Sequence, residues 1–385
     1  MTSQEKKIID NVVKINVNYK NVNFSNLEKE NTTFILTDWK VQIQDSNTFK
    51  SIEEYYNLHK DDLDKNDIIV NENTILIKQS FDLKLLKVDE DNNEEKIKLL
   101  RKVIETYFLE KGNNLHLIVY KQTDMKLNDN YNYNVCINLI NEDNRKDKIN
   151  DFIESNKEFK KSIFFILANK KDEKINSDNL FYLECNNNLY YLSHTAAYLN
   201  NLSLNTIVKD YCYTKSNSII PEVVTKIVTD KQKWIKNYIV NIGGKGVVLG
   251  GELSSGENLV NTFMIMLLEK RLKIELFNLL TLKYNKSEIQ SQLNNIITNE
   301  LNNFYNIEAI ESGFYRNKDY SINYNNYNFK IIDQNEYLSN GYKLYIVDIL
   351  KISEEDNKNH KMTPVIIVLN MQKQIRFIEL DMEII

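Results

Sequence analysis

The sequence predicts an α/β (α+β) protein with a mixed-sheet α/β core, a helix-and-strand C-terminal domain, and extended N- and C-terminal β arms. Three patterns lead to this fold class. Apolar runs of strand length alternate with helical periodicity in the first half of the chain. Two long helical patterns followed by strands occupy the second half, and a strictly alternating segment lies near each end.

Length and composition bound the number of domains. The 385 residues, 42% of them hydrophobic, allow two or three domains at roughly 150 residues each. We expect an N-terminal linking arm over 1–25, an α/β domain over 26–205, a C-terminal core domain over 206–370, and a C-terminal linking arm over 371–385.

The first half of the sequence predicts strands separated by helices. A strand is predicted from Thr33 to Leu36, continuing to Ile43, and Ser51 opens a short capped helix. Apolar residues at helical spacing predict a helix from Glu94 to Leu109, which Gly112 ends. Further strands are predicted over 115–120, 133–139, 163–167 and 180–184, with a charged helix over 148–159. Strands alternating with helices of this size indicate a partly parallel sheet.

The second half begins with helices and ends with strands. Pro221 opens a predicted helix whose apolar face includes Trp234 and Tyr238. Capping-box patterns at Ser254–Glu257 and Ser287–Gln290 predict the starts of two more helices. Strands are predicted over 342–349, 364–369 and 375–385, with a polar loop over 353–361.

The two chain ends carry amphipathic strands. The N-terminal strand alternates apolar and polar residues and is basic, whereas the C-terminal strand is acidic. The residues concerned are Val13, Lys14, Ile15, Val17 and Tyr19 at one end, and Ile378, Glu379, Leu380, Asp381, Met382, Glu383 and Ile384 at the other. In a self-contained monomer such strands usually fray or close the protein's own sheet. Alternatively, each strand adds to a neighbour's sheet and links subunits.

Charge, cysteines and hydropathy exclude several classes of function. Lys and Arg total 49 against 54 Asp and Glu, so a net charge of -5 offers no footprint for direct nucleic-acid binding. Cys136, Cys185 and Cys212 are too widely spaced for a disulfide framework or a zinc site. No apolar window reaches the ~18 residues that a membrane span needs, and no signal-peptide core is seen, so we expect no membrane insertion.

Six of the nine glycines fall between Gly243 and Gly256. Their spacing matches neither a phosphate-binding loop nor a dinucleotide fingerprint. We interpret the cluster as a structural turn or a connection between packed helices. The alternative is an α/β enzyme that binds a phosphate ligand at this turn; nucleotide-dependent thermal stabilisation that disappears in Lys245→Ala would support it.

The histidines do not form a catalytic arrangement in the sequence. His59, His116, His194 and His360 are scattered, and the adjacency of Ser193 and His194 is interpreted as chance. His116 lies in a strand run and is predicted to be a hydrogen-bonded histidine rather than a base. We expect no catalytic residue, no cofactor and no metal.

Several local patterns resemble the contractile-tail sheath proteins of myovirus-type phages and related injection machines, over nearly the whole chain. The matching segments are 33–38, 48–56, 105–120, 193–197, 236–238 and 250–256. In order, they resemble the family's opening strand, the helix after it, a helix ending in an aromatic pair before a strand, an Ala-rich helix, an Asn-Tyr helix end, and the turn before a long helix.

The resemblance implies a structural subunit that stacks in six-fold rings around an inner tube, linked by arms donated to neighbouring copies. The implied partners are further copies of this chain, the tail tube protein, and baseplate and tail terminator proteins. The implied location is the virion tail, after assembly in the bacterial host cytoplasm. Another virion tail component remains an alternative. If Val13–Tyr19 pairs with Ile378–Ile384 of a neighbour, basic and acidic side chains adjoin, which favours pairing by ~0.2–1 kcal/mol per pair.

Overall fold

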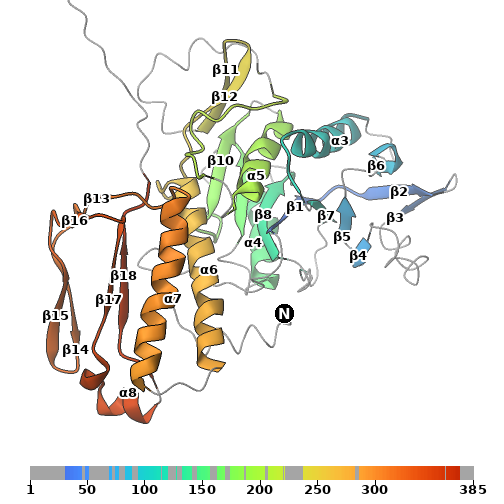
Figure 1. Ribbon diagram of the computed structural model, residues 1–385. Coiled ribbons are helices and arrows are strands. Elements are labelled where there is room, and N and C mark those ends of the chain that lie inside the picture. The colour runs from blue at the N-terminus through green and yellow to red at the C-terminus, as the bar shows by residue number, and fades with distance from the viewer. Residues whose placement is uncertain are drawn as a thin grey trace, which may run out of the picture. The chain divides into compact units, whose positions relative to one another are not determined.

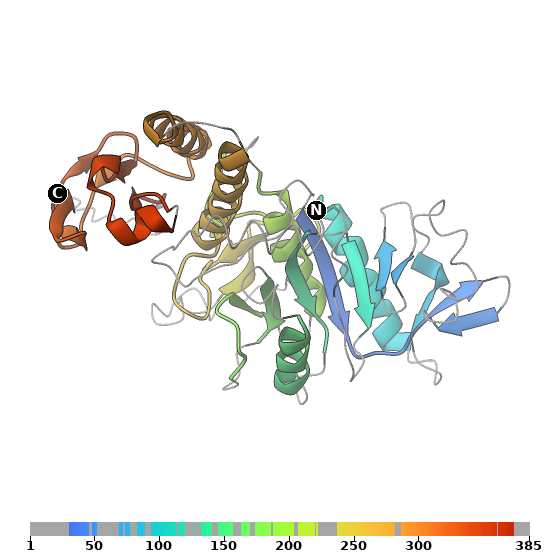
Figure 2. The same ribbon diagram turned by 90° about the horizontal axis from the view of Figure 1, so that it is seen from below.

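A computed structural model gives the fold of the chain (Figures 1 and 2). It describes residues 31–372 apart from 46–47, 52–68, 72–73, 78–82, 89–93, 114, 120–126, 128–131, 141–144, 157–162, 170–173, 186–187, 204–206, 220, 222–236, 282–285 and 360. Both predicted arms, the helix predicted after Ser51, and most of the helix predicted after Pro221 therefore lie outside the described residues. The described chain forms two compact units, 31–202 with 211–263, and 203–210 with 264–372.

The first unit contains a nine-stranded mixed sheet in the order β12-β11-β10-β9-β8-β1-β7-β5-β4. Its strands are β1 (Asn31–Thr37), β4 (Ile69–Asn71), β5 (Thr74–Ile77), β7 (Leu115–Val119), β8 (Asn132–Asn138), β9 (Phe164–Ala168), β10 (Leu180–Glu184), β11 (Asn237–Ile242) and β12 (Lys245–Leu249). The central strands from β7 to β11 pair in parallel, and the strands at both edges pair antiparallel. This confirms the predicted α/β class and the mixed sheet.

Helices cover both faces of this sheet (Figure 2). On one face α4 (Arg145–Ser155) buries Phe152 against Phe34, whose ring centroids lie 5.6 Å apart. On the other face lie α3 (Glu94–Leu109) and α5 (Leu192–Asn201), which contact each other. Short elements complete the unit: a three-stranded sheet of β2 (Val41–Asp45), β3 (Thr48–Ser51) and β6 (Leu86–Val88), and 3-10 turns at Leu83–Leu85 and Leu189–Tyr191.

The second unit combines two long helices and one short helix with three two-stranded sheets (Figure 1). α6 (Leu259–Thr281) enters this unit at Met264, and α7 (Lys286–Asn306) follows it. The sheets pair β13 (Gly313–Phe314) with β16 (Tyr337–Leu338), β14 (Tyr320–Tyr324) with β15 (Tyr327–Ile332), and β17 (Tyr342–Ile346) with β18 (Val365–Leu369). A 3-10 turn at Ile349–Lys351 and the short helix α8 (Glu354–Lys358) lie between β17 and β18.

The region around the glycine cluster differs from the sequence-based expectation. The expected helix would include Tyr238, but this residue belongs to β11, which pairs in parallel with β10. Gly243 and Gly244 have φ of 61° and 79° and turn β11 directly into β12, so the turn joins two strands rather than two helices. Two successive positive φ angles define the tight hairpin turn whose twist matches the flanking strands, and glycine adopts them without strain. A hairpin turn of this kind requires strand backbone on both sides, and this overrides the helical spacing.

Other boundaries also differ from the prediction. The predicted strand from Thr33 to Ile43 is two strands, because the chain leaves the large sheet after Thr37. Ser254 does not cap α6; Asn258 does, since its Oδ1 accepts a hydrogen bond from Asn261 N at 3.0 Å. The loop predicted over 353–361 contains α8, capped by Ser353 through Asp356 N. Short polar residues can cap at several neighbouring positions, so the sequence alone does not select one.

Candidate functional site: a buried polar cluster around Glu110

Glu110 is a buried carboxylate at the C-terminal end of α3. Its N–H donates to Thr106 O, so the residue continues the last helical turn, and Lys111 then takes a φ of 67°. Gly112 follows, and a Cβ there would lie 2.3 Å from the Tyr107 ring. The chain must therefore turn sharply against α3, and Glu110 faces into the protein with only 7% of its surface exposed.

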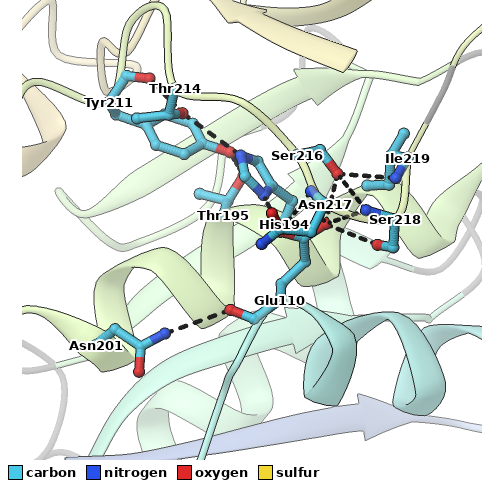
Figure 3. Close-up of polar contacts among 10 residues, drawn as sticks. All are labelled: Glu110, His194, Thr195, Asn201, Tyr211, Thr214, Ser216, Asn217, Ser218 and Ile219. Atoms are coloured by element: carbon cyan, nitrogen blue, oxygen red, sulfur yellow. Dashed lines mark hydrogen bonds and ion pairs between the residues drawn. The ribbon is translucent and has the colours of Figure 1, made fainter. Parts of the chain in front are cut away.

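The Glu110 carboxylate accepts hydrogen bonds from a single short segment, 216–218, and from His194 (Figure 3). Donors to Oε1 are Ser216 Oγ at 2.5 Å, Ser218 Oγ at 2.7 Å, and the backbone N of Asn217 and of Ser218, each at 2.9 Å. His194 Nδ1 lies 3.2 Å from Oε2. A carboxylate that accepts this many hydrogen bonds is well solvated by the protein itself.

These contacts set the ionisation of Glu110. Burial is the largest single influence and raises its pKa, but the hydrogen bonds from His194, Ser216 and Ser218, with the charge of His194, outweigh burial. The net result is a pKa lowered from 4.5 to about 2. The folded protein therefore holds Glu110 as a carboxylate at all ordinary pH values.

A carboxylate, an imidazole and a hydroxyl occur here in the order of a hydrolytic triad, because His194 Nε2 lies 3.4 Å from Thr214 Oγ1. However, Thr214 Oγ1 donates to Tyr211 O at 2.8 Å, so its proton is directed away from the imidazole. His194 is also only 4% exposed, so its imidazole is almost completely shielded from solvent. The arrangement is better suited to holding the chain than to nucleophilic catalysis.

The segment that the cluster holds, Tyr211–Ile219, runs along the outer side of β12; we call it the strap. Its backbone bonds to β12 through Tyr213 N to Val248 O, Val248 N to Thr214 O, and Ser216 N to Gly246 O, at 2.8–3.0 Å. Tyr211 anchors the start of the strap, since its hydroxyl lies 2.7 Å from Thr195 Oγ1 on α5. Glu110 thus joins the end of α3 to a strap that covers an edge of the large sheet.

A second polar cluster lies where β10 ends and β11 begins. Asn237 Nδ2 donates to Tyr182 O and Glu252 O, and its Oδ1 accepts from Gly251 N and Glu252 N. The distances are 2.6–3.1 Å, and Asn237 is buried. Gly250 and Gly251 here have φ of 102° and 114°. In this part of the glycine cluster, the buried Asn237 side chain therefore accepts hydrogen bonds from the backbone N–H groups of Gly251 and Glu252. These N–H groups are satisfied within the protein.

The structure tests some of the predictions made for individual residues and leaves others untested. The linking residues at both ends lie outside the described residues, so their pairing stays a prediction. His116 is a buried hydrogen-bonded histidine, as predicted: Nδ1 lies 3.2 Å from Tyr133 Oη, and burial lowers its pKa to about 3. Ser193 Oγ donates to Val103 O rather than acting with His194. No sequence pattern points to Glu110, because its donors lie more than 80 residues away along the chain.

The described residues contain no group of three or more His, Cys, Asp or Glu side chains placed to hold a metal ion. Among the helices that the structure describes, none has the length and apolar character that crossing a membrane requires.

Comparison with known proteins identifies the fold. No family model matches the chain, and no curated protein matches its sequence. A chain in the six-fold symmetrised cryo-EM structure of the anti-feeding prophage baseplate has a similar fold, with a TM-score of 0.53 and 10% sequence identity. The match covers 96% of this chain and 98% of that chain. A sheath tail protein from Desulfitobacterium hafniense also matches, with a TM-score of 0.42, 9% identity, and coverage of 77% and 90%.

The likeness to the baseplate chain extends over both units and confirms, at the level of the fold, the resemblance to contractile-tail proteins seen in the sequence. The chain therefore shares the fold of that baseplate chain. Fold alone does not define function, which depends on the surfaces that this chain presents.

Proposed function

We propose that this chain is a structural, non-catalytic subunit of a contractile phage-type tail sheath. It polymerises around the tail tube as stacked six-fold rings, and its contraction drives the tube through the host envelope. Its partners are further copies of itself, the tail tube protein, and baseplate and tail terminator proteins. It belongs to the virion tail and is assembled in the bacterial host cytoplasm. The observation that carries the proposal is the fold match, over 96% of this chain, to a chain in the six-fold symmetrised structure of the anti-feeding prophage baseplate.

The two-stranded sheet of β17 and β18 supports a role in linking subunits. All ten residues of the two strands are partly exposed, and β18 consists of the apolar run Val365–Leu369. Within the described residues, no third strand pairs with either one. A strand edge of this length and hydrophobicity is a template for a strand from another chain.

One face of this sheet is already packed. Tyr345, Ile366 and Val368 pack against a small core that includes Phe329 on β15. On β17, Tyr342 Oη bonds to Asn302 Oδ1 of α7 at 2.8 Å. The sheet is thus held in place by β15 and α7, and an arm that pairs with its edge would gain main-chain hydrogen bonds on a rigid template. We assign this edge to the arms Val13–Tyr19 and Ile378–Ile384 of neighbouring copies, which pair with each other alongside it.

Truncation tests the linking role. Deleting residues 1–20 or residues 374–385 is expected to leave a folded, soluble monomer that no longer polymerises, because a strand donated to a neighbour's sheet is not part of the chain's own core. Negative-stain imaging of the purified full-length protein should show striated hollow cylinders, and circular dichroism should show that each truncated protein stays folded. Truncated protein that still forms long tubes would contradict the linking role, and full-length protein that never assembles would contradict the sheath.

A further inference from the structure

One end of the second unit exposes an aromatic and basic patch, formed by Phe314, Arg316 and Tyr337. Phe314 and Tyr337 are cross-strand neighbours in the β13–β16 ladder, with exposed fractions of 48% and 55%. Their rings meet edge to face at 5.0 Å, and the Arg316 guanidinium lies 5.0 Å from the centre of the Phe314 ring. Aromatic residues and arginine are the residues most enriched among those that dominate binding energy at protein interfaces.

Hydrogen bonds join the loops of this patch, and the patch carries a positive charge that no described carboxylate neutralises. Arg316 bonds to Asn335 Oδ1, and it makes no ion pair with any described residue. Tyr315 N donates to Glu336 O, and Asn335 N donates to Tyr315 O, which joins the two loops of the patch. The nearby carboxylate of Glu336 is already paired with Lys343 at 2.5 Å. A partner with an apolar group next to a carboxylate would therefore match this surface.

The 3-10 turn after β17 presents such a group. Leu350 is 87% exposed, the largest fraction among the large hydrophobic residues that the structure describes as exposed. Glu354 and Glu355 follow it in the first turn of α8, are exposed, and make no ion pair with any described residue. We call Leu350, Glu354 and Glu355 the tip.

Hydrogen bonds hold the backbone of the tip in place, although the Leu350 side chain is exposed. Asp348 accepts from Leu350 N at 2.9 Å, Gln290 of α7 accepts from Ile349 N at 3.3 Å, and Asn325 Nδ2 donates to Lys351 O at 3.0 Å. The last two contacts come from α7 and from the β14–β15 turn, and the Asp348 contact caps the 3-10 turn itself. A single exposed leucine is ordinary on a protein surface, but one whose turn is held by two other elements is pre-organised for binding.

The lysines near the tip contact other groups or lie away from Leu350. Lys351 Nζ lies over the rings of Tyr327 and Phe329, at 4.9 and 5.0 Å from their centres. Lys361 pairs with Asp356 at 3.6 Å, and Lys358 is at the opposite end of α8 from Glu354. The side of the tip that adjoins Leu350 is therefore acidic.

The patch and the tip lie at opposite ends of the second unit. β13 and β16 form one end, β14, β15, β17 and β18 run lengthwise, and α8 lies at the other end (Figure 1). The chain path agrees, because β16 precedes β17 and the 3-10 turn follows it. Two complementary surfaces at opposite ends of one unit cannot meet within one molecule, but they can meet between copies.

We propose that the tip of one copy docks on the patch of the next copy, with Leu350 against Phe314 and Tyr337 and with Glu354 or Glu355 paired to Arg316. The occupant of the patch is thus a second copy of this chain. The contact is head to tail, so repetition closes into a ring or extends into a helix. It rests on the proposed self-assembly and is additional to the contacts made by the arms.

Self-association of the full-length chain tests this contact by sedimentation velocity over a range of concentrations. Leu350→Asp and Arg316→Glu are each expected to weaken association at least tenfold. Combining Arg316→Glu with Glu354→Arg and Glu355→Arg restores it, because the charges are exchanged across the contact. Both single substitutions are at exposed positions, so the fold should persist, and circular dichroism checks this.

Two matched controls separate the contact from general surface effects. Ile207→Asp introduces the same charge at another exposed apolar residue, which is 58% exposed, and Lys318→Glu reverses a charge two residues beyond Arg316. Neither control should change association. If Leu350→Asp and Arg316→Glu associate like wild type while the arm truncations abolish assembly, the tip contact is wrong and the proposed function stands. If the wild-type protein stays monomeric, both are wrong.

Discussion

Glu110 shows how one side chain can organise a distant segment of the chain. Its carboxylate accepts hydrogen bonds from the hydroxyls of Ser216 and Ser218 and from the backbone N–H groups of Asn217 and Ser218. Together with the His194 contact, these hydrogen bonds more than offset the cost of burial. A buried acceptor with this many charge-assisted hydrogen bonds contributes stability only while it is ionised. Replacing Glu110 should therefore directly destabilise the strap.

Glu110→Gln should lower the free energy of unfolding by about 1–3 kcal/mol, because several charge-assisted hydrogen bonds become neutral and one amide donor faces other donors.

Lowering the pH should destabilise the wild-type protein through the same carboxylate. Its folded pKa of about 2 lies below 4.5, so its stabilisation is present above pH 4.5 and is lost as pH falls toward 2. Urea unfolding at pH 7 and pH 3 measures both effects.

The glutamine variant should lose less stability between those two pH values than wild type. Glu105→Gln, at an exposed position on the same helix, is the matched control and should leave the unfolding curve nearly unchanged. Equal stability of Glu110→Gln and wild type at pH 7 would contradict a clamping role for Glu110.

At the scale of elements, β12 is an outer strand of the nine-stranded sheet, and the strap covers its free side. An uncovered edge strand invites pairing with another chain. Gly246 makes this cover possible, because a Cβ at that position would lie 2.0 Å from Ile219 O. The absence of a side chain there lets the strap approach closely.

Gly246→Ala should push the strap away from β12 and cost about 1–3 kcal/mol of stability, the range expected when an extra methyl group is forced into a packed site. Hydrogen exchange at Tyr213 and Ser216 should accelerate, since both amides bond to β12. Gly243→Asn is the control: a φ of 61° suits asparagine, and a Cβ at this position would have no atom within 4 Å, so stability should change little. Unchanged exchange in Gly246→Ala would argue that the strap is not held by close approach.

At the scale of the whole molecule, the function proposed for the chain depends on surfaces that only other copies can complete. The β17–β18 edge, the tip and the aromatic patch all lie in the second unit. The first unit supplies a large sheet whose β12 edge is covered by the strap, whereas the second unit leaves the β17–β18 edge open among the described residues. Assembly should therefore respond to changes in the second unit and the arms far more than to surface changes in the first.

The charges of the two arms offer a test at this scale. Replacing Lys14 and Lys20 by Glu should weaken assembly, because like charges would then face the acidic strand at ~0.2–1 kcal/mol per pair, repeated throughout the array. Replacing Glu379, Asp381 and Glu383 by Lys in the same protein should restore assembly. Electron microscopy and sedimentation at several salt concentrations measure both outcomes. A double-reversed protein that assembles no better than either single reversal would show that the arms do not pair with each other.

Local patterns in the sequence are enough to predict the elements whose signals are short-range. The helix over Glu94–Leu109 and the strand over Leu180–Glu184 are predicted with the bounds that the structure has. Both have complete apolar periodicity and clear neighbours, such as Gly112 after the helix. The α/β class follows from their alternation, and the match to a baseplate chain confirms the resemblance in fold.

Contacts between distant segments are decided only by the tertiary structure. Tyr238 has helical spacing with its predecessors, yet the hairpin turn at Gly243–Gly244 and pairing with β10 make it part of a strand. Glu110, Ser216 and His194 meet from three separate segments, and no local pattern relates them. Periodicity indicates which face of an element is buried, but it does not indicate which distant segment packs against that face. The buried Glu110 carboxylate and the strap depend on such packing between distant segments.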